Sequence, residues 1–362
     1  MFAGLINAGR DAVVACLRAE QARSEGRMSL RQYQNVTIIG DGGMGSVLSI
    51  LLCEKGIATR MWGYDGGQLA QFERKRENVK FLPGYKLPES LTFEPKDDRA
   101  MAGADLIVSA VPCQYMRGIW KRLRNHVPDD VPILSVAKGI ENGTLQRPTQ
   151  IIQDVLGDGR TLAVLSGPTI ADELARRLPA TACAAAEDEE LARGVQQTFT
   201  CPWLRVYTNT DVVGVELAGA MKNVVAIAAG IVDGVGGGDN AKAALLARGL
   251  AEITRLGVAM GAREQTFAGL TGLGDLVTTC ISPTGRNRSF GERIGKGRTF
   301  AEAQAATQSV VEGISTCKSV VALAERYGVE MPITRAVYEV LFESKPVRGA
   351  IEDLMSRRPK AE

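Results

Sequence analysis

The segment from residue 35 to residue 56 constrains the fold of this chain more than any other stretch. It opens with Asn35-Val-Thr-Ile-Ile-Gly40, a β-branched run with the composition of a buried strand. The turn Gly40-Asp-Gly-Gly-Met-Gly45 and an apolar stretch of helical length, residues 46–56, follow directly. A strand, a G-x-G-x-x-G turn and a helix in this order form the dinucleotide-binding fingerprint, which is weak as a bare motif but specific with these flanks. The segment therefore predicts a βαβ unit that binds a pyrophosphate.

Each motif glycine in this turn has a physical role. Gly40 allows the tight turn, Gly42 lets the backbone approach the pyrophosphate, and Gly45 lets the helix pack on the strand. Backbone N–H groups at the helix N-terminus then face the phosphates. The alternative, a glycine-rich turn without a ligand, is disfavoured by the matching strand and helix on either side.

A second strand is predicted at Ala58-Thr-Arg-Met-Trp62. The acidic residue that binds the adenosine ribose is expected about 20 residues after the glycines, near Asp65. Tyr64 lies at a similar spacing and could stack on adenine. Arg60 is the nearby arginine that could bind a 2′-phosphate. The sequence therefore leaves the choice between NAD and NADP open.

Further strand-like runs follow at the spacing of an α/β protein. They are residues 105–110, 131–136, 161–165, 181–185 and 204–207. These runs predict a Rossmann domain with a doubly wound, mostly parallel sheet. Ligands bind beyond the carboxyl ends of such strands, so residues 111–115, 137–139 and 166–169 are candidate walls of a cleft. Residues 84–88 and 94–99 are interpreted as surface loops.

From about residue 210 the pattern becomes helical and contains no convincing strand. Apolar periodicity predicts helices within residues 240–257, 299–327 and 347–357. The predicted segments are an N-terminal extension (1–34), a dinucleotide-binding Rossmann domain (35–209), an all-α substrate and catalytic domain (210–357) and a short tail (358–362).

Residues 215–232 are small and apolar almost throughout, which predicts a helix buried on all sides. Lys222 interrupts this stretch, and a buried ammonium group is unfavourable unless an anionic group meets it. Two interpretations are open. The side chain either reaches water or serves a ligand in the space left by small neighbours such as Gly219 and Ala226. A membrane span is disfavoured because polar residues interrupt the stretch and a glycine-rich segment ends it.

Two polar clusters stand out in the second half. In Gly269-Leu-Thr-Gly-Leu-Gly-Asp-Leu-Val-Thr-Thr279, Asp275 lies between apolar neighbours after a glycine-rich turn. In Gly285-Arg-Asn-Arg288, an arginine near a helix start has the right shape for bidentate phosphate binding. A solvated helix cap is the alternative interpretation of the second cluster, since exposed arginine is common.

Composition narrows the possible functions. The formal net charge of +2 at pH 7 disfavours a dedicated nucleic-acid-binding protein. His126 is the only histidine, so a His-rich metal site or a Ser-His-Asp triad is nearly excluded and proton transfer falls to Lys, Asp or Glu. The seven cysteines contain no Cys-x-x-Cys pair. They therefore predict neither a zinc site nor a disulfide framework, and they suit a cytoplasmic location.

The first 34 residues carry several arginines but lack the apolar core and cleavage site of a secretory signal. Acidic residues argue against a transit peptide. We interpret this segment as an extension, non-native or disordered, ahead of a start at Met28. A tether to a membrane surface is the alternative.

The motifs, taken in order, resemble those of bacterial NAD(P)-dependent glycerol-3-phosphate dehydrogenase. Beyond the cofactor turn, the resemblance rests on Lys138-Gly-Ile-Glu141, Ser166-Gly-Pro-Thr169, residues 216–223, Gly272-Leu-Gly-Asp275 and Arg286-Asn-Arg288. It extends over residues 36–357 and implies a Rossmann domain, a helical domain and a cleft between them. It also implies reversible reduction of dihydroxyacetone phosphate to sn-glycerol 3-phosphate for phospholipid synthesis, with NAD or NADP as cofactor, and a homodimer.

The resemblance implies roles for individual residues. Lys222 resembles the catalytic acid/base, Lys138 a contact to both substrate and cofactor, and Asp275 a buried carboxylate near the substrate. Asn223 is grouped with these three. The other substrate contacts implied are Gly167, Thr169, Gly285, Arg286 and Asn287. The other cofactor contacts implied are Gly40, Gly42, Gly43, Met44, Gly45, Tyr64, Tyr115, Ala171, Arg286, Val310 and Glu312.

Two positions depart from the family pattern. Gly43 and Met44 stand where the family commonly has a small polar residue and an aromatic one. The backbone cradle is retained, but one side-chain hydrogen bond and one stacking contact to the cofactor would be lost. We therefore expect weaker cofactor binding than is usual in the family.

The chemistry suits these residues independently of the resemblance. Hydride transfer to a carbonyl develops an alkoxide, which needs both a nearby cation and a proton. A buried lysine can supply both, because burial lowers its pKa toward neutrality while a carboxylate raises it again. One alternative is a 3-hydroxyacid or ketopantoate-type dehydrogenase, in which the lysine and the asparagine lie one helical turn apart. It is disfavoured because Lys222 and Asn223 are adjacent in this chain. The other alternative is a non-catalytic NAD(P)-binding regulator, which would need no buried Lys–Asp pair.

Overall fold

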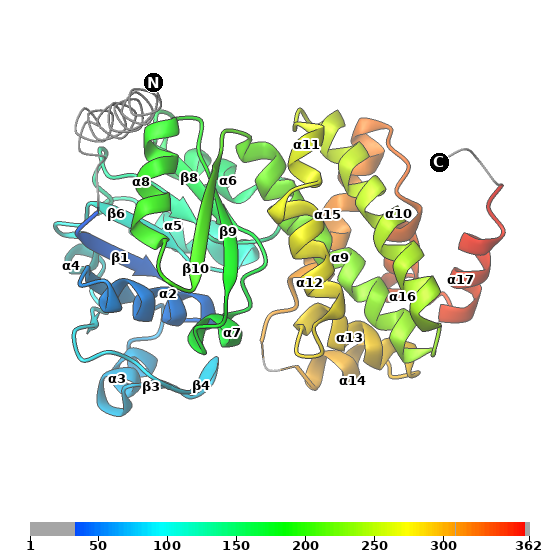
Figure 1. The fold of residues 1–362 in the computed structure, drawn as a ribbon, viewed down its shortest axis with the longest axis horizontal. Helices are drawn as coiled ribbons and strands as arrows, with labels where there is room; N and C mark the ends of the chain where they lie inside the picture. The colour runs from blue at the N-terminus through cyan, green and yellow to red at the C-terminus, as the bar shows by residue number, and fades with distance from the viewer. Residues whose placement is uncertain (1–32, 308, 359–362) are drawn as a thin grey trace, which may run out of the picture. The chain divides into compact units, whose positions relative to one another are not determined.

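The computed structural model describes residues 33–307 and 309–358. Within them, an α/β half built on one large sheet is followed by a half made of helices (Figure 1). This arrangement confirms the predicted fold class. The interpretations of residues 1–32, including a start at Met28, and of residues 359–362 lie outside the described part of the chain.

The large sheet contains eight strands in the order β10-β9-β8-β7-β6-β1-β2-β5. Their bounds are β1 (Asn35–Ile39), β2 (Ala58–Trp62), β5 (Thr92–Phe93), β6 (Leu106–Ser109), β7 (Ile133–Ser135), β8 (Leu162–Ser166), β9 (Ala180–Ala185) and β10 (Leu204–Asn209). Neighbouring strands are parallel, except that β8 and β9 pair antiparallel. The sheet is therefore mostly parallel, with two strands reversed at one edge.

Helices cover both faces of this sheet, because successive strand residues point to opposite sides. Ile38 packs into a core shared with α2 and α8, whereas its neighbour Ile39 packs into a core shared with α5 and α6. The helices of this half are α2 (Gly43–Glu54), α3 (Gly66–Lys75), α4 (Asp97–Met101), α5 (Cys113–Leu123), α6 (Pro148–Leu156), α7 (Ala171–Ala175) and α8 (Glu189–Phe199). Both faces thus carry an apolar core, as parallel sheets require.

Two segments predicted as surface loops contain regular structure, so that prediction was wrong. Leu82–Lys86 forms β4, which pairs antiparallel with β3 (Glu77–Asn78), and Asp97–Met101 forms α4. β4 contains Gly84, which adopts a φ of +85°. Glycine is uncommon inside strands, so the sequence there does not have the composition of a strand. The two strands are separated by residues 79–81 only, and their register shifts between Glu77 and Asn78, so the pair lacks the regular alternation by which strands are recognised.

The second half is organised around the long helix α9 (Val212–Gly234), of which every residue from 214 to 231 is buried. One side of α9 packs with α10, α12 and α15, and the other packs with α13 and α16. By length and composition, α9 alone among the described helices could cross a membrane, but 94% of its apolar window is buried within the fold. It is therefore the core helix that the sequence predicted.

Shorter elements surround α9. They are α10 (Gly238–Ala259), α11 (Glu264–Phe267), η1 (Leu270–Gly274), α12 (Asp275–Ile281), α13 (Arg286–Gly295), α14 (Phe300–Ala305), α15 (Glu312–Tyr327), α16 (Pro332–Phe342) and α17 (Val347–Met355). The stretch 299–327, for which helical structure was predicted, contains two helices, α14 and α15. The break places Glu312 at the start of a helix.

Glycines allow α9 and α13 to lie in backbone contact. A Cβ on Gly230 would overlap the carbonyl oxygen of Arg288, and a Cβ on Gly291 would overlap the carbonyl oxygen of Ile227. Only glycine permits such close approach of two helices. This contact fixes the start of α13, where Arg286 lies, relative to Lys222 on α9.

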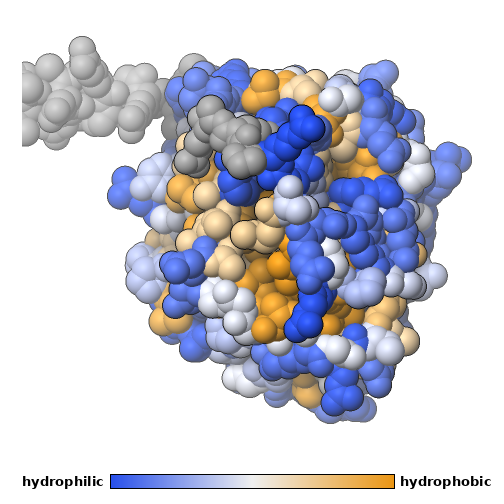
Figure 2. Space-filling model, turned by 90° about the vertical axis from the view of Figure 1, so that its right-hand side faces the viewer, coloured by the Kyte–Doolittle hydropathy of each residue, from blue (hydrophilic) through white to orange (hydrophobic). Residues whose placement is uncertain are grey.

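The helical half leaves some apolar surface open to solvent. Figure 2 shows it as an orange hollow bordered by blue, hydrophilic side chains. The half-buried hydrophobic side chains of α16 and α17 include Tyr338, Val340, Phe342 and Val347.

Candidate active site

Two lysines share one carboxylate where the two halves meet. Lys222 Nζ donates to Asp275 Oδ1 at 2.9 Å, and Lys138 Nζ donates to Asp275 Oδ2 at 2.7 Å. Lys138 comes from the loop after β7, Lys222 from the middle of α9 and Asp275 from the first residue of α12. Three segments that are far apart in the sequence thus place their charged groups together, as expected for a site between the halves.

Burial sets the protonation behaviour of this cluster. The side chains of Lys222 and Asp275 are only 7% and 3% exposed. Burial lowers the pKa of Lys222 to about 8; the charge of Asp275 opposes this shift and that of Lys138 adds to it. Burial alone would raise the pKa of Asp275, but the two ammonium groups hold it below its usual value. Lys222 is therefore close to the protonation balance that an acid/base group needs.

The helical position of Asp275 brings a further residue to Lys222. Thr279 lies four residues on, one turn along the same face of α12. Its Oγ1 is 2.5 Å from Lys222 Nζ and 3.2 Å from Asp275 Oδ1. Thr279 was not among the residues predicted for the site, although its spacing of four residues from Asp275 was a usable signal.

The Gly-Pro-Thr loop forms the wall next to Lys138. Lys138 Nζ donates to the carbonyl oxygen of Gly167 at 2.8 Å, and Thr169 Oγ1 donates to the same oxygen at 3.1 Å. Gly167 has a φ of +136°, and a Cβ there would lie 3.0 Å from Ala182 Cα. Glycine is therefore required for the loop to turn back against β9.

Two asparagines connect α9 with the starts of α13 and α15. Asn287 Nδ2 donates to Asn223 Oδ1 at 2.9 Å, and the backbone N–H of Gly313 donates to Asn287 Oδ1 at 2.9 Å. Asn223 Nδ2 also lies 3.4 Å from the carbonyl oxygen of Lys138. Both amides are buried, so their visible role is to align these segments.

Arg286 and Glu312 lie beyond this pair. Arg286 is the first residue of α13, with Gly285 as its N-cap, and it is exposed and forms no ion pair within the described part of the chain. Glu312 Oε1 accepts a hydrogen bond from the backbone N–H of Cys113 at 3.3 Å, whereas Oε2 is buried without a partner among the described residues. Burial raises the pKa of Glu312 to about 7, which that hydrogen bond and the charge of Arg286 partly oppose. An unpaired buried oxygen of this kind points to a missing donor.

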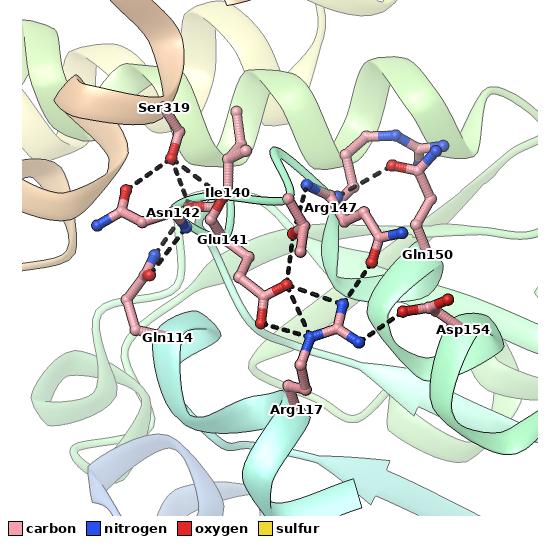
Figure 3. A network of polar contacts seen from close by, with 11 residues as sticks. Gln114, Arg117, Ile140, Glu141, Asn142, Arg147, Gln150, Asp154 and Ser319 are labelled. Atoms are coloured by element: carbon pink, nitrogen blue, oxygen red, sulfur yellow. Dashed lines mark hydrogen bonds and ion pairs between the residues drawn. The ribbon is translucent and has the colours of Figure 1, made fainter. Parts of the chain in front are cut away.

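A polar network holds the loop that carries Lys138 (Figure 3). Arg117 of α5 donates to Glu141 through three hydrogen bonds of 2.9–3.0 Å. Gln114 Nε2 and Ser319 Oγ both donate to the carbonyl oxygen of Ile140, at 2.8 and 3.1 Å. Gln114 belongs to the sheet half and Ser319 to the helical half, so both halves donate hydrogen bonds to the same loop.

The turn between β1 and α2 has the shape that a dinucleotide requires. Gly40 has a φ of +117°, and a Cβ on Gly45 would overlap the carbonyl oxygen of Gly40. Among the described residues, no atom lies within 4 Å of a Cβ built on Gly42, so the backbone there is open to a ligand. Tight packing behind an open backbone surface is the cradle for a pyrophosphate at a helix N-terminus.

The structure explains the two departures in this turn. A Cβ on Gly43 would lie 2.7 Å from the carbonyl oxygen of Phe81, so the β3–β4 segment excludes a larger residue. Met44 packs partly against the core of the sheet half. The close contact with Phe81 therefore accounts for glycine at position 43, whereas Met44 fills part of the space beside the core.

The remaining predicted cofactor residues lie around this turn or at the start of α15. Tyr64 and Tyr115 are 70% and 59% exposed, which leaves both rings accessible. Ala171 begins α7, and its Cβ lies 3.7 Å from the position that a Cβ on Gly43 would take. Val310 is 36% exposed and lies two residues before Glu312. Their roles as cofactor contacts stay predictions.

Family models match this chain in two parts. The N-terminal region of NAD-dependent glycerol-3-phosphate dehydrogenase matches residues 35–192, and the C-terminal region of the same family matches residues 211–352.

Individual relatives give the same result. The chain is 47% identical to the NAD(P)+ glycerol-3-phosphate dehydrogenase of Chlorobium phaeobacteroides, over 90% of this chain and 98% of that protein. It is also 47% identical to that of Geobacter sp. strain M21, over 91% of this chain and 99% of that protein. The crystal structure of glycerol-3-phosphate dehydrogenase from Coxiella burnetii superimposes with a TM-score of 0.86 at 34% identity, over 90% of this chain and 99% of that chain. A ketopantoate reductase from Ralstonia eutropha shares the fold alone, with a TM-score of 0.55 at 15% identity, over 89% of this chain and 99% of that chain.

Proposed function

The chain belongs to the NAD-dependent glycerol-3-phosphate dehydrogenase family, and on this premise we propose how its site carries out the reaction. The protein is an NAD(P)-dependent oxidoreductase that acts on a CH–OH group, and its reaction interconverts dihydroxyacetone phosphate and sn-glycerol 3-phosphate. The observation that supports the mechanism is the buried Lys222–Asp275–Lys138 cluster.

Lys222 is the proton donor in the reduction. When bound, the nicotinamide cofactor supplies the hydride. Lys222 Nζ gives its proton to the carbonyl oxygen as negative charge develops there, and it takes the proton back in the oxidation. Asp275 keeps the ammonium group in place through the 2.9 Å hydrogen bond. Asn223 acts indirectly, because its amide joins α9 to the start of α13.

Lys138 and Arg286 bind the phosphorylated substrate. Lys138 is 18% exposed at its side chain, so it can contact a ligand while it remains paired with Asp275. Arg286 offers an exposed, unpaired guanidinium group at a helix N-terminus, where backbone N–H groups also favour an anion. Gly167 and Thr169 lie beside Lys138, and Gly285 and Asn287 flank Arg286 in the chain, so we assign all four to the substrate contact as well.

The turn from Gly40 to Gly45 would hold the pyrophosphate of the cofactor, because it offers an open backbone surface and a helix N-terminus. Tyr64 and Tyr115 would contact its aromatic rings, and Arg286, Ala171 and Val310 would flank it. The partnerless Oε2 of Glu312 would accept a hydrogen bond from the carboxamide end. This division makes residues 35–209 the cofactor domain and residues 210–357 the substrate and catalytic domain.

The test is to follow the absorbance of reduced nicotinamide while dihydroxyacetone phosphate is supplied, with NADH and NADPH in separate reactions. We expect oxidation of the cofactor that depends on this substrate, and none with unphosphorylated dihydroxyacetone or with ketopantoate. Consumption of ketopantoate would favour that alternative. Silence with both cofactors, in protein shown to be folded by circular dichroism, would favour the non-catalytic regulator.

We also propose that the chain works as a cytoplasmic homodimer that supplies glycerol 3-phosphate for phospholipids and binds no nucleic acid. The apolar hollow of the helical half supports a subunit contact, because large exposed apolar patches mark interaction surfaces (Figure 2). The six described cysteines are free, which suits a reducing compartment. Light scattering of the purified protein measures the subunit number, and a monomer would contradict the proposal.

A further inference from the structure

A carboxylate of the cofactor turn lies at the carboxyl end of β2. Asp41 follows the first motif glycine, and its Oδ2 lies 2.7 Å from the place where a Cβ on Gly63 would begin. Gly63 directly follows β2, and it lies beside the turn because Ile39 of β1 pairs with Trp62 of β2. The turn after β1 therefore places an acidic group in the space that a side chain at position 63 would otherwise fill.

This is the place where dinucleotide-binding folds distinguish their two cofactors. An acidic side chain near the end of the second strand binds the ribose 2′-hydroxyl of NAD, whereas an arginine accommodates the 2′-phosphate of NADP. The sequence spacing pointed to Asp65 for this role. However, Asp65 Oδ1 accepts a hydrogen bond from the backbone N–H of Gly67 at 2.8 Å and caps α3. The Asp41 carboxylate, by contrast, lies directly against the residue that follows β2.

The surrounding residues fix Asp41 but leave one of its oxygens open. Gln68 Nε2 donates to Oδ2 at 2.7 Å, and Asn78 Nδ2 donates to the carbonyl oxygen of Asp41 at 2.9 Å. Within the described residues, Oδ1 accepts no hydrogen bond, so it is available to a ligand hydroxyl. Asp65 is also close enough to act on Asp41, since its charge adds to the effect of burial in raising the pKa of the Asp41 carboxyl.

The nearby cations are mostly committed elsewhere. Arg60 Nη1 donates to three backbone carbonyl oxygens, those of residues 99, 100 and 102, at 2.8–3.1 Å. Arg122 pairs with Asp97 through two hydrogen bonds of 2.8 Å. Lys80 is exposed, but its charge acts on Asp41 itself. A 2′-phosphate would thus meet a carboxylate before it met an unpaired guanidinium group.

We propose that Asp41 makes this protein select NAD over NADP. Asp41 Oδ1 accepts a hydrogen bond from the ribose 2′-hydroxyl of NAD, and the carboxylate repels the 2′-phosphate of NADP. The inference rests on the proposed function, because it states which nicotinamide cofactor the same site takes. It also gives a reason for glycine at position 63, since a Cβ there would displace the carboxylate.

The test is to titrate the full-length protein with NADH and with NADPH, in the absence of substrate, and to measure each Kd by nicotinamide fluorescence. We expect NADH to bind at least about tenfold more tightly, since repulsion between close charges is of this size at a protein surface. In Asp41→Asn, which keeps the shape and an acceptor for Gln68, the ratio of the two Kd values should fall by about tenfold. Asp41→Ala serves as a second variant should Asn disturb the turn.

The matched control is Glu187→Gln, which removes one negative charge at an exposed position after β9, and it should leave the ratio unchanged. Wild-type protein that binds NADPH as tightly as NADH would overturn the proposal, and so would variants at Asp41 that change both Kd values equally. Because the measurement of Kd needs no turnover, it tests cofactor selection by Asp41 separately from the proposed dehydrogenase activity. A preference for NADH without reduction of dihydroxyacetone phosphate would sink the proposed function and leave the role of Asp41 intact.

Discussion

Asp275 allows two ammonium groups to lie close together in a buried site. Each of its oxygens accepts a hydrogen bond from one lysine, so neither buried charge is unpaired. The cluster as a whole keeps one positive charge, because two ammonium groups outnumber one carboxylate. A residual positive charge away from water is what an anionic substrate and a developing alkoxide require.

The proposed role of Lys222 predicts how its variants behave. Lys222→Ala should lower kcat/KM by about a hundredfold or more, the usual effect of losing a positioned acid. Lys222→Arg should fail as well, because arginine does not release its proton near neutral pH. Lys296→Ala, which removes an exposed lysine from the end of α13, is the control and should retain activity. Near-normal turnover of either Lys222 variant, in folded protein, would contradict the assignment.

The lowered pKa of Lys222 predicts opposite pH profiles for the two directions. Reduction of the ketone needs the protonated lysine, so kcat/KM should fall as the pH rises through about 8. Oxidation of the alcohol needs the neutral lysine, so kcat/KM should rise through the same pH. Both profiles can be measured across roughly pH 6 to 10. Inflections of the same sign in the two directions would argue against Lys222 as the shared acid and base.

At the scale of elements, α9 and α13 form the contact that aligns the proton donor with the phosphate site. The two helices touch through backbone atoms at Gly230, Gly291 and neighbouring glycines. A methyl group added to one of these glycines would have no space. Overpacking of this kind costs about 1–3 kcal/mol of folding free energy. The glycines in this contact therefore serve both packing and function.

Gly230→Ala should lower the free energy of unfolding by about 1–3 kcal/mol and also weaken substrate binding, because the shift would move Arg286. Gly349→Ala is the matched control. It adds the same methyl group within α17, where no described atom lies within 4 Å of the new Cβ. It should stabilise the protein slightly, by up to about 1 kcal/mol. Urea unfolding and KM measure the two effects, and similar behaviour of the two variants would refute the argument from close packing.

At the scale of the whole molecule, buried polar contacts join the sheet half to the helical half. Glu216 of α9 has a fully buried side chain that accepts hydrogen bonds from the backbone N–H and the Oγ1 of Thr149, at 2.8 and 2.7 Å, and pairs with Arg147. Ser319 of α15 adds the contact with the loop that carries Lys138. The position of α9 against the sheet, and with it the position of Lys222, depends on these contacts.

Glu216→Ala should therefore lower stability by about 3–5 kcal/mol, because it leaves the largely buried guanidinium group of Arg147 without its ion-pair partner. It should also separate the unfolding of the two halves. All three tryptophans, Trp62, Trp120 and Trp203, lie in the sheet half, so their fluorescence reports that half, whereas far-UV circular dichroism reports the helices of both halves. The two signals should coincide in the wild type and in the exposed control Glu352→Ala. Coincident transitions in Glu216→Ala would show that the contact does not couple the halves.

The sequence by itself determined the features that local patterns encode. The strand–glycine turn–helix segment, the strand-like runs that follow it and the apolar stretch around Lys222 were sufficient to predict a Rossmann domain followed by helices. They work because strand alternation, turn geometry and helical burial are properties of residues close together in the chain.

Only the tertiary structure decided which residues meet. It brought Thr279 to Lys222, placed Phe81 against Gly43, and put the Asp41 carboxylate beside Gly63 at the end of β2. Each of these contacts joins segments separated in the sequence, so no local spacing encodes it. The physical reason is that packing of the whole chain, not the pattern of any one segment, determines where side chains have space and which charges share it.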